Sequence, residues 1–209
     1  MIAIINYRAG NLTSVKRALD HEGIPGQITD DADTLASSRG IIFPGVGAAG
    51  SAMHNLRETN LDDTIMDLVS RGKPMLGICL GCQIILDKSM ENNASTLSIL
   101  AGDCRRFDHD LLDEHGDLIN IPHMGWNSVS LVRECELFRD IPLEAEFYFV
   151  HSYCPVPRND LVIGLTNYGR DFCSVFGRPG LWAMQFHPEK SGRPGLKILN
   201  NFYRYCMDV

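Results

Sequence analysis

The sequence feature that most constrains the fold is residues 73–83, KPMLGICLGCQ, with Cys79 at its centre. The apolar run from Pro74 to Ile78 predicts a buried strand, and Gln83 to Leu86 predict the beginning of a helix. Glycines stand two residues before and two residues after Cys79, and they permit a turn too sharp for residues with side chains. This pattern is typical of a strand-to-helix elbow, which exposes a nucleophile at the edge of a sheet.

Cys79 would lie at the first turn of that helix. Unpaired N–H groups and the helix dipole favour the thiolate over the thiol at such a position. The competing interpretation is a structural cysteine beside two tight-turn glycines, because free cysteines are commonly buried. The remainder of the chain has to distinguish the two.

Length and composition describe an ordinary globular protein. The chain has 209 residues, a length that predicts a single domain over residues 1–209 with a substantial core. Its net charge of −7, without a cluster of Lys or Arg, argues against binding to nucleic acid. No apolar run approaches the roughly 18 residues that a membrane span needs. The N-terminal segment MIAIINYRAGN reads as a strand and not as a signal peptide.

The cysteines indicate a reducing compartment. Their number, seven, is odd and they are scattered along the chain, which argues against a disulfide framework and favours the cytoplasm. Cys79 and Cys82 form one C-x-x-C, but zinc needs clustered ligands, and neither a second pair nor an H-x-H partner follows. We therefore expect neither a metal nor a cofactor.

The first 86 residues alternate short apolar strands with helices. Strands are expected at residues 2–6, 26–29, 40–43 and 74–78, and helices at 12–21, 30–36, 51–57 and 61–71. This alternation on short connections predicts an α/β fold with a doubly wound, mostly parallel sheet and helices on both faces.

After Leu86 the pattern changes. Residues 87–96 are polar and predict a loop, and turn signals such as GRPG at 177–180 separate the strand-like segments that follow. Those segments are 97–100, 104–107, 118–121, 128–132, 146–153, 161–167, 172–176 and 181–186. They predict antiparallel strands added to the sheet in the C-terminal half. A C-terminal helix with an apolar stripe should follow Ser191, whose side chain would cap it.

A cysteine nucleophile needs a base, and His187 is the best placed of the seven histidines. It follows an apolar strand, and open α/β sheets place their sites at the C-terminal ends of strands. Glu189, two residues further on, would hydrogen-bond the far ring nitrogen and so fix the tautomer. The alternative is a half-buried histidine with an unrelated carboxylate nearby.

Amide or ester chemistry also needs a site for the negative charge on the attacked carbonyl oxygen. The turn Pro44-Gly45-Val46-Gly47 follows another apolar strand, and its glycines allow the N–H groups at Val46 and Gly47 to point inward. Together with the N–H of Leu80, this turn predicts a two-donor oxyanion hole. A phosphate-binding turn is the competing interpretation, but neither the G-x-G-x-x-G spacing nor the GK[ST] ending is present.

The motifs PGVG, GICLG, Gln83 and HPEK, in this order, resemble those of the class I (triad) glutamine amidotransferases over nearly the whole chain. Three further segments, YRAGNLTSV at 7–15, IPHMGWN at 121–127 and YFVHSY at 148–153, resemble the glutaminase subunits of imidazole glycerol phosphate synthases. The resemblance implies that Cys79 attacks the side-chain amide of L-glutamine, with His187 and Glu189 completing the triad. The ammonia would pass to a (β/α)8 cyclase subunit in a heterodimer. That subunit would make imidazole glycerol phosphate and aminoimidazole carboxamide ribotide in histidine biosynthesis.

The resemblance also implies roles for individual residues. The residues that match substrate-holding positions are Gln83, Glu91, Ser152 and Tyr153. Those that match synthase-facing positions are Asn11, Trp126, Tyr148 and Lys190, with Trp126 the best single anchor by residue type. The Pro44 to Gly47 turn is the implied switch, because the N–H of Val46 must point inward and a strained turn between glycines suits two states.

Three alternatives stay open. A C-x-x-C after a strand is also a thiol–disulfide exchange motif, although an oxidoreductase needs neither the glycine frame nor HPE nor PGVG. A paralogous glutaminase would supply ammonia to another synthase, for example in sugar amination. A non-catalytic binding module would not need the intact triad. In addition, Cys82 stands where methionine is frequent in the family, and it suggests a reversible Cys79–Cys82 disulfide that switches the glutaminase off.

Overall fold

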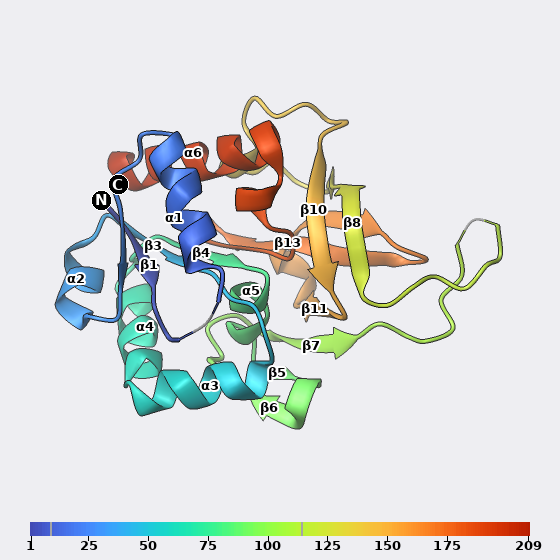
Figure 1. Cartoon of the computed structure of the whole chain (residues 1–209), viewed down its shortest axis with the longest axis horizontal. Helices are drawn as coiled ribbons and strands as arrows, with labels where there is room; N and C mark the ends of the chain where they lie inside the picture. Colours follow the sequence, from blue (N-terminus) through green and yellow to red (C-terminus); the bar gives the residue numbers. More distant parts are fainter. Residues whose placement is uncertain (9, 114) are drawn as a thin grey trace.

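A mixed β-sheet lies between two groups of helices, as the computed structural model of the chain shows (Figure 1). The structure describes residues 1–8, 10–113 and 115–209, and within them eight strands form this sheet in the order β2-β1-β3-β4-β14-β13-β12-β9. The first five strands of that order run parallel to one another, and the last three are antiparallel. The predicted fold class, a mostly parallel sheet with added antiparallel strands, is therefore confirmed.

The N-terminal half forms the parallel part of the sheet and most of its helices. Its elements are β1 (Ile2–Ile5), α1 (Leu12–His21), β2 (Gly26–Thr29), α2 (Ala32–Ser37), β3 (Gly40–Phe43), α3 (Ala49–Glu58), α4 (Leu61–Ser70), β4 (Met75–Ile78) and α5 (Leu80–Ile84). Each lies within a few residues of its predicted position. The predictions succeed here because β1, β3 and β4 are short apolar runs and every long helix has an apolar stripe.

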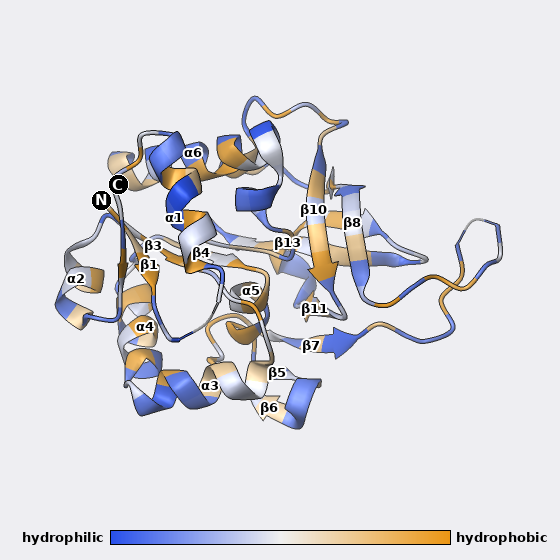
Figure 2. Cartoon of the chain, in the orientation of Figure 1, coloured by the Kyte–Doolittle hydropathy of each residue, from blue (hydrophilic) through white to orange (hydrophobic). Residues whose placement is uncertain are grey.

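The parallel strands β1, β3, β4 and β14 are apolar throughout because helices cover both faces of the sheet, whereas the edge strand β2 includes the exposed Gln27. In β1, Ile2 and Ile4 pack with residues of α1 and α6, whereas Ala3 and Ile5 pack with residues of α2, α3 and α4. Figure 2 shows the resulting hydrophobic strands at the centre and hydrophilic residues on the outer faces of the helices. Among the described residues, no helix combines the length and the apolar character that crossing a membrane requires.

The C-terminal half adds two smaller sheets, β10-β8 and β11-β7-β5-β6, and the last strand of the parallel group. Its strands are β5 (Lys88–Ser89), β6 (Ala94–Ser95), β7 (Gly102–Arg106), β8 (His123–Ser128), β9 (Ser130–Leu131), β10 (Glu146–His151), β11 (Tyr153–Pro157), β12 (Val162–Asn167), β13 (Asp171–Arg178) and β14 (Leu181–Met184). The 3-10 helices are η1 (Glu91–Asn93), η2 (Glu136–Phe138), η3 (Asn159–Leu161) and η4 (Pro188–Lys190), and α6 (Gly192–Asp208) ends the chain.

Four local predictions in this half are wrong. Residues 97–100 form no strand, because the N–H groups of Leu97 and Ile99 donate to the carbonyls of Ile84 and Ile85 after α5. Residues 118–121 contribute only an isolated bridge. The expected loop at 87–96 contains β5, η1 and β6. Ser191 occupies the N-cap position of α6 without capping it, because its hydroxyl oxygen accepts the N–H of Tyr148 at 2.9 Å and its O–H donates to the carbonyl of His187 at 2.6 Å.

The topology brings three strand ends together. β3, β4 and β14 are adjacent and parallel, so their C-terminal ends meet at one edge of the sheet. The segment after β3 is the Pro44–Gly47 turn, the residue after β4 is Cys79, and the segment after β14 leads to His187. Chain segments more than 140 residues apart in the sequence thus meet at one place.

Candidate active site

The elbow at Cys79 is strained, and its two glycines make it possible. Cys79 has φ 52° and ψ −109°, a conformation that residues with side chains rarely adopt. A Cβ on Gly81 would lie 1.8 Å from the carbonyl oxygen of Phe43, and one on Gly77 would lie 3.2 Å from the backbone of Cys82. The glycines therefore let α5 begin directly against the ends of β3 and β4, and the strained residue between them is the predicted nucleophile.

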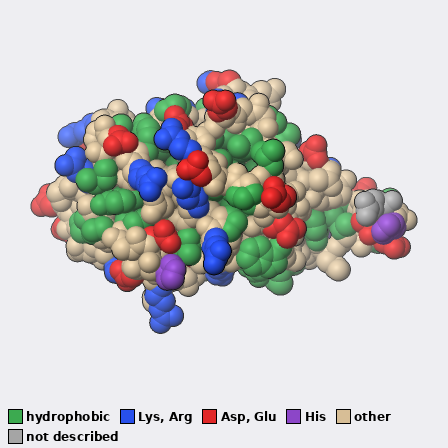
Figure 3. Space-filling model, turned by 90° about the horizontal axis from the view of Figure 1, so that it is seen from above, with side chains coloured by type: hydrophobic (Ala, Val, Ile, Leu, Met, Phe, Trp, Pro, Cys, Tyr) green, Lys and Arg blue, Asp and Glu red, His purple; other side chains and the backbone are tan. Residues whose placement is uncertain are grey.

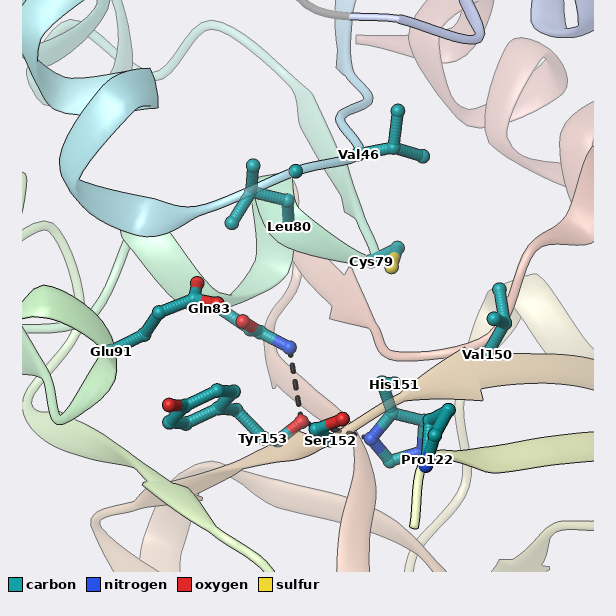
Figure 4. Close-up of a pocket in the computed structure, with 11 residues that line it drawn as sticks. Val46, Cys79, Leu80, Gln83, Glu91, Pro122, Val150, His151, Ser152 and Tyr153 are labelled. Carbon is teal, nitrogen blue, oxygen red and sulfur yellow. Dashed lines mark hydrogen bonds between the residues drawn. The ribbon is translucent and has the colours of Figure 1, made fainter.

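A cavity of about 340 Å³ opens beside Cys79. Figure 4 shows Cys79 between the turn that carries Val46 and the segment that joins β10 to β11. The predicted oxyanion and substrate residues that line it are Val46, Gly47, Leu80, Gln83, Glu91, Ser152 and Tyr153. Pro122, Val150 and His151, which the sequence did not suggest as site residues, complete the lining. The structure thus gathers every residue predicted for these two roles around one cavity.

His187 and Glu189 form a buried pair. The ring nitrogen Nδ1 of His187 lies 2.7 Å from Oε1 of Glu189, and both side chains are almost completely buried. Among the described residues, Nε2 of His187 and Oε2 of Glu189 have no hydrogen-bond partner of good geometry. Burial lowers the pKa of His187, but its interactions with Cys79 and Glu189 outweigh burial and raise this pKa to about 10. The ring is therefore an imidazolium at neutral pH.

Asn11 also contacts the pair. Its amide nitrogen Nδ2 donates to the same Oε1 of Glu189 that Nδ1 of His187 contacts. Asn11 precedes α1 with φ 73°, and its side chain is half-buried. We expected this residue to face a synthase, and nothing in the sequence suggested its contact with Glu189, because the two are 178 residues apart.

The predicted oxyanion turn adopts a conformation without a two-donor hole. The N–H of Leu80 donates to the carbonyl of Gly45 at 3.3 Å. In a trans peptide the C=O and N–H point in opposite directions, so the N–H of Val46 points away from Leu80. Tyr7 also contacts the turn, because its hydroxyl donates to the carbonyl of Pro44 at 2.9 Å.

Two of the predicted substrate residues already have protein partners. Nε2 of Gln83 donates to the carbonyl of Tyr153 at 3.0 Å and to Oε1 of Gln185 at 2.8 Å. One carboxylate oxygen of Glu91 accepts the N–H of Ala49 at 2.8 Å, at the start of α3. Oε1 of Gln83 and the second oxygen of Glu91 have no such bond among the described residues, and both side chains line the cavity.

A pair of buried histidines adjoins the cavity: His151 is part of its lining and His123 contacts His151. Nδ1 of His151 donates to the carbonyl of Tyr153 at 2.8 Å, and Nε2 of His151 lies 3.1 Å from Nδ1 of His123. Nε2 of His123 in turn lies 3.3 Å from Nδ2 of Asn127. Burial lowers the pKa of His123 to about 4 and that of His151 to about 3. Both rings are therefore neutral, and they hold the backbone of Tyr153 in place.

The remaining predicted interface residues lie on neighbouring elements. Trp126 of β8 pairs with Tyr148 of β10, and their rings meet edge to face at 6.0 Å. Lys190 places its ammonium 5.9 Å from the centre of the Tyr148 ring. Trp126, one of the two tryptophans of the chain, is 54% exposed. In the part of the chain that the structure describes, no three His, Cys, Asp or Glu side chains are arranged to hold a metal ion.

Comparison with known proteins places this site in a family. The family model described as "Glutamine amidotransferase class-I" matches residues 4–206. Solved structures with the same fold include PurLQS from Thermotoga maritima, with a TM-score of 0.70 and 17% identity over 98% of this chain and 97% of the other. The chain therefore belongs to the class I glutamine amidotransferases.

Curated relatives narrow the family further. The protein of Maridesulfovibrio salexigens is 58% identical over 100% of this chain and 99% of its own length. The protein of Methanocaldococcus jannaschii is 45% identical over 97% of this chain and 98% of its own length. Both are named imidazole glycerol phosphate synthase subunit HisH, and within the class I amidotransferases this chain belongs to that HisH family.

Proposed function

We propose that this protein is the glutaminase subunit of an imidazole glycerol phosphate synthase. It hydrolyses L-glutamine and transfers the ammonia to a (β/α)8 cyclase subunit in histidine biosynthesis. The observation that carries the proposal is the meeting of Cys79, the Val46 turn and the His187–Glu189 pair at the ends of three adjacent parallel strands. The HisH names of relatives that span the whole chain support the assignment to this pathway.

In the proposed reaction the thiolate of Cys79 attacks the side-chain carbonyl carbon of glutamine. His187 supplies the proton that the leaving nitrogen needs, and its raised pKa supports this role because the ring is protonated at neutral pH. Ammonia then departs and a thioester remains. Water attacks the thioester, His187 accepts a proton from the water, and glutamate leaves as the sulfur is regenerated. Glu189 holds the ring with Nε2 directed to the reaction throughout.

The turn at Pro44–Gly47 is proposed to limit this reaction. The carbonyl of Gly45 accepts the N–H of Leu80, one of the two donors that the oxyanion needs. Rotation of the Gly45–Val46 peptide would release Leu80 and direct the N–H of Val46 into the cavity. The turn in this structure therefore fits a state of low activity, and binding of the synthase would favour the rotated state.

The substrate would lie in the cavity beside Cys79. Glu91 is suited to the α-ammonium group of glutamine, because one of its carboxylate oxygens accepts the N–H of Ala49 and the other has no hydrogen bond within the described part of the chain. Oε1 of Gln83 is an available acceptor, and the backbone at Ser152 and Tyr153 forms the opposite wall. Hydrolysis of an amide by this triad requires no cofactor.

The synthase is proposed to dock on the surface formed by Asn11, Trp126, Tyr148 and Lys190. Trp126 and Met124 are 54% and 62% exposed. They lie two residues apart on β8, so their side chains point to the same face. Seen from above, hydrophobic side chains gather among charged ones on the side of the molecule where β8 and β10 lie (Figure 3). An exposed tryptophan within such a patch is a typical interface anchor. A cytoplasmic location is proposed from the seven unpaired cysteines.

The test is a glutaminase assay of the protein alone, with the cognate cyclase subunit, and with that subunit plus its ribulosyl ligand. We expect low activity alone and a large rise with both. Cys79→Ala should reduce glutamate release by at least about 10⁴-fold, because the nucleophile is removed. Cys135→Ala is the control, since this half-buried cysteine lies outside the cavity and should leave the activity unchanged.

The same assay separates the alternatives. Activity that survives Cys79→Ala would refute the proposed nucleophile. Full activity without any partner would refute the dependence on a synthase. A paralogue that feeds another synthase would show its stimulation only with that other synthase.

A further inference from the structure

The amide of Gln185 lies between the two cysteines of the elbow. Gln185 follows β14, its side chain is completely buried, and its backbone N–H donates to the carbonyl of Ser174. Nε2 of Gln185 donates to the sulfur of Cys79 at 3.6 Å. Its Oε1 accepts the thiol of Cys82 at 3.7 Å and Nε2 of Gln83 at 2.8 Å. One side chain therefore connects the proposed nucleophile with the residue that the sequence left without a function.

The orientation of this amide follows from its neighbours. The carbonyl of Tyr153 is only an acceptor, so the nitrogen of the Gln83 amide must face it. The second hydrogen of that nitrogen then points to Gln185, which must present its oxygen there. The nitrogen of Gln185 consequently faces Cys79. This chain of hydrogen bonds ends at the backbone carbonyl of Tyr153, which fixes its direction. If the Gln185 amide were reversed, its NH₂ group would face the NH₂ group of Gln83.

The helix after Cys79 offers few competing donors. α5 spans only Leu80–Ile84, and a helix of this length has a small dipole. The N–H groups of Cys82 and Gln83 donate to the carbonyl of Cys79, and the N–H of Leu80 donates to Gly45. A thiolate at Cys79 therefore depends on side-chain donors more than the sequence pattern of the elbow suggests.

We propose that Gln185 is a thiolate-stabilising residue whose amide N–H donates to the sulfur of Cys79, and that Gln83 and the thiol of Cys82 hold the amide in this orientation. The proposal rests on the proposed function only in that Cys79 is the nucleophile. It also gives Cys82 a purpose. A methionine at position 82 has no S–H and would leave the oxygen of Gln185 with one donor fewer.

Several ionisable groups face Cys79 besides the amide of Gln185. His187 follows β14, with Glu189 bonded to its far side; Tyr7 follows β1; Cys82 lies on α5 and Cys104 on β7; Glu91 and His151 line the same cavity. These groups keep their chemical identity when only position 185 is altered, although Gln83 and Cys82 lose the acceptor that Oε1 of Gln185 provides. A variant at position 185 therefore reports on the whole amide, and the Cys82 variants below alter only one contact to its oxygen.

The test follows the alkylation of Cys79 by iodoacetamide as a function of pH, with the modified peptide quantified by mass spectrometry. Cys79→Ala provides the blank. In Gln185→Met, which keeps the volume but removes the donor, the inflection of the Cys79 profile should move upward by about one pH unit, because a hydrogen bond to a charged group is lost. Circular dichroism and the thermal midpoint establish that the variant is folded. A profile that superimposes on that of the parent would overturn the proposal.

A second pair of variants provides an independent test if Gln185→Met does not fold. Cys82→Ser keeps a donor to the oxygen of Gln185, whereas Cys82→Ala removes it at a similar size. We expect an upward shift of the Cys79 inflection in Cys82→Ala and none in Cys82→Ser, and equal profiles would contradict the holding role of Cys82. Alkylation needs neither glutamine nor a synthase. Failure of this test is therefore distinct from failure of the proposed glutaminase function.

Discussion

Cys82 illustrates how burial decides the chemistry of a single residue. The spacing Cys79-Leu80-Gly81-Cys82 suggests a redox-sensitive disulfide. In the structure the side chain of Cys82 is completely buried and its thiol donates to Gln185. Burial raises the pKa of this thiol well above its usual value. A thiol that stays protonated is a poor nucleophile toward an oxidised Cys79, so the structure disfavours the disulfide.

We therefore predict that mild peroxide inactivates the glutaminase through Cys79 alone. The parent and Cys82→Ser should lose activity at the same rate and recover equally with dithiothreitol, because the product is a sulfenic acid. Dimedone labelling of Cys79 and peptide mass spectrometry provide the measurement. A Cys79–Cys82 disulfide peptide in the parent, together with slower or irreversible inactivation of the variant, would revive the redox switch.

A site residue could be predicted from the sequence only where its role requires a characteristic spacing of neighbouring residues. Cys79 could be predicted because Gly77 and Gly81 frame it, and Gln83 and Glu91 only through family motifs. The role of Gln185 could not be predicted, because a single polar residue at the end of an apolar strand reveals neither its partners nor its orientation. The contact of Asn11 with Glu189 could not either, since it depends on how α1 and η4 pack.

At the scale of elements, β8 and β10 are joined by a histidine pair as well as by backbone bonds. The ring of His123 stacks on Phe149 at 4.8 Å and on Tyr168 at 4.0 Å. Because His151 holds the carbonyl of Tyr153, this pair links the wall of the cavity to the strand that carries Trp126. Protonation of either ring would place a charge in an aromatic cluster.

The pair predicts a loss of stability in mild acid. In the unfolded chain both histidines bind protons below a pH of about 6.5, whereas in the folded protein they bind them only near 4 and 3. Above pH 6.5 neither state is protonated and the pair has no effect on the pH dependence. As the pH falls below 6.5, the unfolding free energy should decrease by up to about 1.4 kcal/mol per pH unit for each histidine.

Urea unfolding at pH 7.5, 6.5, 5.5 and 4.5 measures this dependence. His123→Gln should lower the stability at pH 7.5 and should also reduce the slope below pH 6.5. His21→Gln, at an exposed position of α1, is the control and should keep the slope of the parent. Equal slopes in all three proteins would show that the buried pair does not cause the acid sensitivity.

Elements were predicted best where hydrophobic periodicity is matched by burial. α1 and β3 have the predicted bounds because an amphipathic stripe or a short apolar run specifies them. The segment at 97–100 is equally apolar, but its N–H groups bond to the end of α5 instead of to a strand. Apolar character alone does not reveal which groups the backbone N–H and C=O will bond. The sequence pattern therefore could not predict the loops and short strands after Leu86.

At the scale of the whole molecule, the two halves of the chain contribute different parts of the site. The parallel half supplies the turn and Cys79, and the C-terminal half supplies His187 together with the opposite cavity wall. That wall belongs to β10 and β11, and β10 pairs with β8. A partner bound to β8 and β10 would therefore lie beside the segment that borders the cavity at Cys79.

This arrangement makes Trp126 the residue with which to test the docking surface. Trp126→Ala should weaken binding of the cyclase subunit by about 30-fold or more, because a central aromatic anchor commonly contributes at least about 2 kcal/mol. Titration calorimetry with the cyclase subunit measures the affinity. The unfolding free energy should change little, since the Trp126 side chain is 54% exposed.

Met207→Ala is the matched control. Met207 is 46% exposed and lies in the last turn of α6. The C-terminus that follows this helix lies at the end of the molecule opposite β8 and β10 (Figure 1). This variant should bind the cyclase subunit with the affinity of the parent. If both variants bind like the parent, the synthase docks elsewhere, and the exposed tryptophan needs another explanation. If Trp126→Ala alone fails to bind and also loses its stimulation by the synthase, β8 and β10 carry both the contact and its effect on the cavity.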